Sequence, residues 1–394
     1  MPYFIFKNNS SYEELFSAII AGSVLFIGMG IGRFAYTAIY PYMLIDGILT
    51  VKQGSIAASI NYTGYLLGAL LCGVLSKKKS QQICVISILG TTACLFLLSA
   101  VENVYLIYNI RFFAGVFSAL SMVYSALWLF SVLSHSRKVP VLYSGVGIGI
   151  FFSSEILALI INYDFDSQSM WFSLGCVTFL IGAFCVLGLK RTSIKSSLPT
   201  NIDHTQSHNN VDVFKVNSLI LIYGLSGFGY IITATYLPAI LKFNFPNFNT
   251  VQLWAVFGLG AVPSCYFWHL IQDRFGHNLS LTLNLFVQAI GVLLPVFSQN
   301  IPIYILSAFI VGGSFMGTVT IAMSAAYHTG NRIKKNLVVH MTFAHGVGQI
   351  IGPIIANYLY NVNHSLSISL YVATFSLLFA AMLCKQSKKP TSYN

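Results

Sequence analysis

The feature that most constrains this chain is a succession of twelve long apolar runs separated by short polar segments. About 20 consecutive apolar residues are needed for a helix to cross the hydrocarbon core of a bilayer, whereas barrel strands are shorter and alternate in polarity. The runs therefore predict an all-α polytopic membrane protein with twelve transmembrane helices. They lie at residues 16–44, 53–76, 82–101, 104–133, 139–162, 169–189, 217–241, 250–271, 279–298, 302–328, 336–360 and 366–384.

Charge is scarce, and its placement predicts an orientation. Charged residues make up 8% of the 394 residues, against about 25% in a soluble domain, so a water-soluble fold is excluded. Seventeen of the 21 lysines and arginines fall on one side of the predicted spans and only Lys52 and Lys242 on the other. Because cytoplasmic loops are enriched in basic residues, both termini are expected in the cytoplasm. The net charge of +11 thus reflects topology, and no nucleic-acid partner is expected.

The chain contains signs of an internal repeat. A shift of 197 residues places Gly30, Gly32 and Pro41 on Gly227, Gly229 and Pro238, and Gly115 on Gly312; a shift of 201 aligns Gly145 and Gly147 with Gly346 and Gly348. Parallel repeats of this kind build the halves of many secondary transporters, with the substrate site near mid-membrane. We therefore expect an N-terminal six-helix bundle at 1–189, a cytoplasmic linker at 190–216, and a C-terminal six-helix bundle with its tail at 217–394.

Several motifs resemble those of the major facilitator superfamily. The segment DRFG at 273–276 is similar to its cytoplasmic latch loop, RFFAG at 111–115 to its R-x-x-x-G element, and GVGQIIGP at 346–353 to its glycine–proline element. The loop GVLSKKK at 73–79 lacks the acid of the equivalent latch. The segments GMGIGRFAY at 28–36 and NYTGYLLGA at 61–69 resemble the YbfB/YjiJ-type branch. The resemblance implies two pseudo-symmetric bundles, transport across the inner membrane, and a latch at Asp273 and Arg274, but no particular cargo.

Three charged residues fall inside predicted spans: Arg33, Arg111 and Glu155. Charges at membrane depth are costly and usually face a cavity or a partner. All three are expected at a similar depth, and we predict that the arginines bind an anionic substrate. Glu155 either pairs with an arginine or binds a coupling proton, since burial and a nearby cation shift a carboxyl pKa in opposite directions. A buried Arg111–Glu155 bridge that only fixes helix packing is the alternative.

Aromatic and amide side chains at comparable depth are candidates to complete the substrate site. Tyr36 shares a helix face with Arg33, and Tyr230 aligns with Arg33 in the repeat. Packing roles are the alternative for each tyrosine, and interhelical hydrogen bonding is the alternative for His345. The predicted substrate-binding residues are Arg33, Tyr36, Asn61, Tyr62, Tyr65, Arg111, Tyr230, His345 and Gln349.

No enzymatic, cofactor or metal motif is evident. The spacing of Gly30, Gly32 and Ala35 matches a dinucleotide fingerprint, but it lies within an apolar run with no preceding strand,. The predicted function is therefore proton-coupled transport of a small organic anion by a monomer embedded in membrane lipid. Two alternatives are export of amphipathic drugs or metabolites and a non-transporting substrate sensor with the same fold.

Overall fold

The computed structural model describes residues 3–129, 139–163, 165–193, 214–298, 300–333, 337–363 and 365–384. Within these ranges the chain is helical and forms no strand. Eleven helical segments are long and apolar enough to cross a membrane. The larger helices are α1 (Tyr3–Leu25), α2 (Ala35–Ile45), α3 (Val51–Cys72), α4 (Ser80–Ser99), α5 (Val104–Leu127), α6 (Val139–Ile161), α7 (Ser167–Ser193), α8 (Val216–Asn244), α9 (Val251–Phe297), α10 (Ile301–Ile333), α11 (Leu337–Asn363) and α12 (Ser367–Cys384).

The predicted spans at 250–271 and 279–298 lie together in α9. This helix has 47 residues, or about 70 Å at 1.5 Å per residue, which is more than twice the roughly 30 Å of a hydrocarbon core. Its helical geometry is broken at Gly276, where φ is 77° and ψ is 171°. Glycine adopts a positive φ without steric cost, so the break falls at the glycine of the DRFG segment.

The first predicted span is helical but not uniform. Between α1 and α2 the chain forms the π-helix η1 (Phe26–Ile31) and a turn at residues 32–34. The π-helix contains Gly28 and Gly30, and the added Cβ of an alanine at Gly30 would strike the backbone of Gly149 on α6. Irregular turns of this kind are often found at functional sites, and here the turn carries Arg33.

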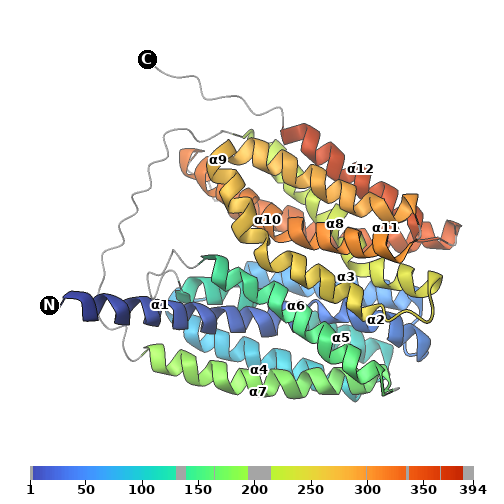
Figure 1. Cartoon of the computed structure of the whole chain (residues 1–394), viewed down its shortest axis with the longest axis horizontal. Coiled ribbons are helices and arrows are strands. Elements are labelled where there is room, and N and C mark those ends of the chain that lie inside the picture. Colours follow the sequence, from blue (N-terminus) through green and yellow to red (C-terminus); the bar gives the residue numbers. More distant parts are fainter. Residues whose placement is uncertain are drawn as a thin grey trace.

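The helices form two groups in space, one from the first half of the chain and one from the second half. Figure 1 shows α1–α7, in blue to green, in the lower part of the view and α8–α12, in yellow-green to red, in the upper part. α3 packs against α5 and α4 against α5 and α7, while α9 packs against α10 and α12 and α8 against α11 and α12. Contacts between the two groups come mainly from α6 with α9 and α3 with α11. The two groups therefore meet mainly along α3, α6, α9 and α11, with smaller contacts from α2 to α8 and α9.

Glycines aligned by the repeat occupy equivalent packing positions. Gly115 on α5 lies against the backbone of Asn61 on α3, and Gly312 on α10 lies against the backbone of Phe257 on α9. Such close helix approach requires small residues. Most of the predicted linker and the C-terminal tail after residue 384 lie outside the described residues.

Candidate functional site

Arg33 lies in the turn that follows the π-helix and is 3% exposed. Its guanidinium stacks on Tyr65 of α3, with Cζ 3.9 Å from the ring centroid, and lies 5.2 Å from the centroid of Tyr62. Aromatic faces attract cations when both are removed from water. One guanidinium nitrogen, Nη2, donates a hydrogen bond of 2.6 Å to Oε1 of Gln349 on α11, while Nε has no partner.

Gln349 connects Arg33 to a polar cluster on α8 and α11. Its Nε2 donates to the Tyr230 hydroxyl at 2.6 Å and lies 3.1 Å from Nε2 of His345. Nδ1 of His345 is 3.0 Å from the backbone carbonyl of Tyr223. Because that carbonyl can only accept, Nδ1 carries a proton and Nε2 accepts from the amide of Gln349. Arg33 and Tyr230, which the repeat aligns, thus bind opposite ends of one amide.

Arg111 on α5 is 1% exposed and has fewer partners than Arg33. Its Cζ lies 4.2 Å from the ring centroid of Tyr36 on α2. Two of its three guanidinium nitrogens, Nε and Nη1, have no hydrogen-bond partner in the part of the chain that the structure describes. Asn61 donates from Nδ2 to the Arg111 backbone carbonyl at 2.8 Å, and its own Oδ1 is buried without a partner. Unsatisfied buried polar atoms are costly and need an explanation.

The predicted acid is not part of this cluster. Glu155 on α6 is half-buried, and its carboxylate makes no ion pair with Arg33 or Arg111 in the described part of the chain. The alternative of a buried Arg111–Glu155 bridge is therefore not formed in this conformation. Depth along a helix axis does not determine which way a side chain points, so a similar expected depth does not imply that the charges meet.

Hydrogen bonds join the two groups of helices on the side predicted to face outward. The hydroxyl oxygen of Tyr62 on α3 lies 3.1 Å from Oγ1 of Thr235 on α8. The hydroxyl of Tyr236 on α8 donates to Oγ of Ser55 on α3 at 2.6 Å. It also lies 3.1 Å from the carbonyl oxygen of Pro353 on α11, within its own group of helices. Ser55 lies four residues after the start of α3, near the loop that joins α2 to α3, whereas Tyr62 lies beside Arg33.

The predicted latch residues form local contacts only. Asp273 is 3.5 Å from His269 one turn earlier, with both side chains more than half exposed. The guanidinium of Arg274 lies 5.5 Å from the ring of the adjacent Phe275. Neither contact reaches a neighbouring helix, so a latch between helices at these residues stays a prediction.

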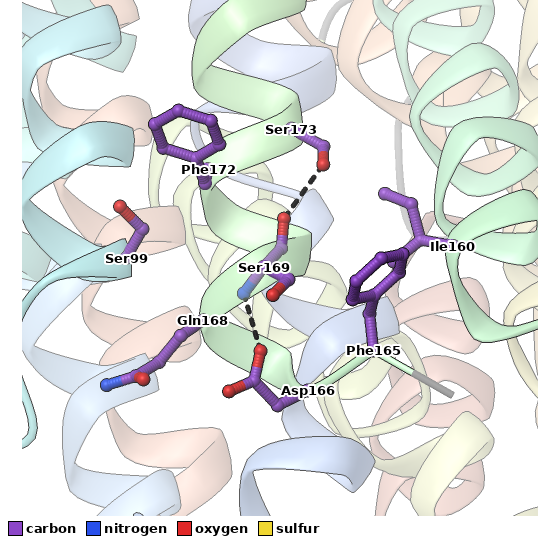
Figure 2. A pocket seen from close by; sticks show the side chains of 8 residues that line it. All are labelled: Ser99, Ile160, Phe165, Asp166, Gln168, Ser169, Phe172 and Ser173. Carbon is purple, nitrogen blue, oxygen red and sulfur yellow. Dashed lines mark hydrogen bonds between the residues drawn. The ribbon is translucent and has the colours of Figure 1, made fainter. Parts of the chain in front are cut away.

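One surface pocket among the described residues lies away from the arginines. It has a volume of about 450 Å³ and lies at the ends of α4, α6 and α7 (Figure 2). Asp166 there accepts a hydrogen bond of 2.9 Å from the backbone N–H of Ser169, which caps α7. None of the predicted site residues is among those that line it: Ser99, Ile160, Phe165, Asp166, Gln168, Ser169, Phe172 and Ser173.

Several residues next to the arginines were not expected from the sequence. Phe315 of α10 stacks on Tyr230 with centroids 5.2 Å apart, and Trp254 of α9 donates from Nε1 to the carbonyl of Phe34 at 3.0 Å. Aromatic residues are frequent in all spans, so no spacing marks these two. A tryptophan inside an apolar run is the one weak signal, since a buried indole N–H needs an acceptor.

Eleven long apolar helices in the described part of the chain identify a membrane protein, and one buried arginine, Arg33, connects its two groups of helices through Gln349. A family model described as "Uncharacterised MFS-type transporter YbfB" matches residues 25–385. The chain belongs to this family, which confirms the resemblance drawn from residues 28–36 and 61–69. No curated protein matches the chain.

Proposed function

We propose that the chain is a secondary active transporter that moves a small organic anion across the inner membrane. The observation that carries this proposal is the pair of buried arginines, neither of which has a carboxylate partner among the described residues. A buried charge without a counter-ion is strongly unfavourable. An anionic substrate placed beside Arg33 and Arg111 would supply the missing charge.

The proposed mechanism is alternating access around this site. It takes α9 as two membrane crossings separated at Gly276, which gives twelve helices in two six-helix bundles, with the linker and both termini cytoplasmic. The equivalent packing of Gly115 and Gly312 supports the repeat,. Hydrogen bonds between the bundles on the outer side, together with the locally paired Asp273, support a conformation closed to the outside. In the opposite conformation, Asp273 and Arg274 would form the cytoplasmic latch.

The proposed site uses all the residues expected from the sequence. Tyr36, Tyr62 and Tyr65 supply aromatic faces to the arginines, Asn61 lies beside Arg111, and Gln349 links Arg33 to Tyr230 and His345. Glu155 is proposed as the proton-coupling group, supported by its half-buried carboxylate, which has no ion-pair partner among the described residues. The transporter is proposed to act as a monomer without a cofactor.

Uptake and counterflow in proteoliposomes test this function. Proteoliposomes that contain the purified full chain are loaded with organic anions. Uptake of the labelled anion is then compared for wild type, Arg33→Gln and Glu155→Gln. We expect Arg33→Gln to reduce uptake to about a tenth or less, because a hydrogen bond to a charged group is lost. Arg191→Gln, at the exposed end of α7, is the matched control. Normal uptake by folded Arg33→Gln and Glu155→Gln proteins would refute the proposal.

Export of amphipathic drugs is a second candidate, supported by the tyrosine and phenylalanine rings around Arg33. A proton-driven efflux assay with a cationic dye distinguishes it, because an anion site gives no dye transport. A substrate sensor with the same fold would bind ligand but show no counterflow.

A further inference from the structure

The two arginines form two separate points of positive charge within one site. Arg33 lies in the turn before α2 and stacks on Tyr65, whereas Arg111 lies on α5 and stacks on Tyr36. Tyr36, which Arg111 faces, lies one helical turn after Arg33. Asn61, which donates to the Arg111 carbonyl, directly precedes Tyr62, whose ring centroid is 5.2 Å from Cζ of Arg33. Their charges are therefore adjacent but held against different aromatic rings.

The protein satisfies these two cations unequally. Arg33 has a neutral acceptor in Oε1 of Gln349 and retains one unpartnered nitrogen, Nε. Arg111 has two unpartnered nitrogens and a tyrosine ring, which offers no in-plane acceptor. Both side chains are at least 97% buried, so bulk water does not compensate them. A bound ligand with acceptor groups could therefore form hydrogen bonds with the unsatisfied N–H groups of both arginines.

Carboxylate and phosphate groups match a guanidinium in charge and in hydrogen-bond geometry. A ligand with one negative charge can neutralise only one arginine, and Glu155 does not pair with the other. We propose that the ligand of this site is a small dianion whose two anionic groups bind separately to Arg33 and Arg111. The group at Arg33 replaces Oε1 of Gln349, and the group at Arg111 binds Nε and Nη1. This inference rests on the proposed anion site and assigns its substrate class.

Binding to the purified full chain in nanodiscs tests the proposal. The probes are short-chain dicarboxylates, each compared with the monoester that removes one of its two charges. We expect at least one dianion to bind about tenfold or more tightly than its ester, since the ester loses a charge-assisted hydrogen bond. An ester that binds as tightly as its dianion would overturn the dianion assignment and leave the anion transporter intact.

Substitution of Arg111 tests the second contact directly. Arg111→Gln is expected to bring the preference for the dianion over the ester below about threefold, while Arg191→Gln leaves it unchanged. Arg111→Lys keeps the charge without the planar fork, so it replaces Arg111→Gln if that variant does not fold, and we expect it to weaken dianion binding. Unchanged dianion binding in a folded Arg111 variant would refute the assignment. If no anion binds and only cations do, the proposed function itself is wrong.

Discussion

Gln349→Glu places a carboxylate where the neutral acceptor of Arg33 now lies. The wild-type amide oxygen is 2.6 Å from Nη2 of Arg33, so a glutamate of nearly the same shape can form an ion pair without moving the backbone. Its second oxygen can accept from the Tyr230 hydroxyl. The variant would then carry its own counter-ion at the position that we assign to an anionic substrate group.

The magnitude follows from the charge that is added. Two unit charges about 4 Å apart attract by about 4 kcal/mol at an effective dielectric constant of 20. Desolvation of the new carboxylate and the lost amide donor to His345 offset part of this gain. We therefore expect the new ion pair to weaken the binding free energy of the substrate anion by about 2 to 4 kcal/mol, which corresponds to a loss of affinity of roughly 30- to 1000-fold.

Anion binding and thermal stability are measured together for Gln349→Glu. The expected result is a melting temperature at or above that of wild type with loss of anion binding and uptake. Gln82→Glu, in the exposed first turn of α4, adds the same charge away from the site and is expected to leave both unchanged. Wild-type affinity in a stable Gln349→Glu protein would show that no anion binds at Arg33.

Three further predictions concern the scaffold. Gly312→Ala is expected to lower the melting temperature because its Cβ would strike the backbone of Phe257. A Cβ at Gly313 would lie at an ordinary contact distance of 3.7 Å from the carbonyl oxygen of Gly260, so Gly313→Ala should be tolerated. Equal stability of both variants would contradict the close approach. Gly276→Ala puts a side chain at a φ of 77° and is expected to lower the free energy of unfolding by about 1 kcal/mol. Thermal unfolding should therefore show a lower melting temperature, and an unchanged melting temperature would contradict the break in α9. Hydrogen bonds from the start of α7 lower the pKa of the Asp166 carboxyl. The stabilising effect of this carboxylate is therefore present above its pKa in the unfolded chain, and it is lost as the pH falls through the lower pKa of the folded state. The melting temperature of Asp166→Asn should depend less on acidic pH than that of wild type, and identical dependence in both proteins would exclude this cap.

Much of the architecture was predictable because lipid imposes a simple requirement on the chain. Apolar runs long enough to cross a bilayer mark the helices, and their positions agree with the helices found. The unexpected features are local: the π-helix at Phe26–Ile31 and the single assignment of α9 across Gly276. Both depend on backbone geometry at glycines, which the hydrophobic pattern does not encode.

The candidate site was predictable in composition but not in pairing. Buried arginines, tyrosines and amides stand out in an apolar sequence, and the repeat aligned Arg33 with Tyr230 before any contact was known. The hydrogen bond between Arg33 and Gln349 joins residues 316 positions apart, and no periodicity predicts which helix faces meet over such a distance. For the same reason, the contribution of Thr235, Tyr236 and Trp254 was missed.

The charge of the site shows why this limit matters for function. The sequence places two arginines and one glutamate at a similar expected depth, and it predicts an anionic substrate without fixing the number of its charges. In the structure, Glu155 is half-buried on α6 and unpaired with either arginine, while the arginines are held by tyrosine faces and one amide. An aromatic face or an amide stabilises a cation without cancelling its charge. The local charge of the two arginines is therefore closer to +2, and this charge supports a dianion as the proposed cargo.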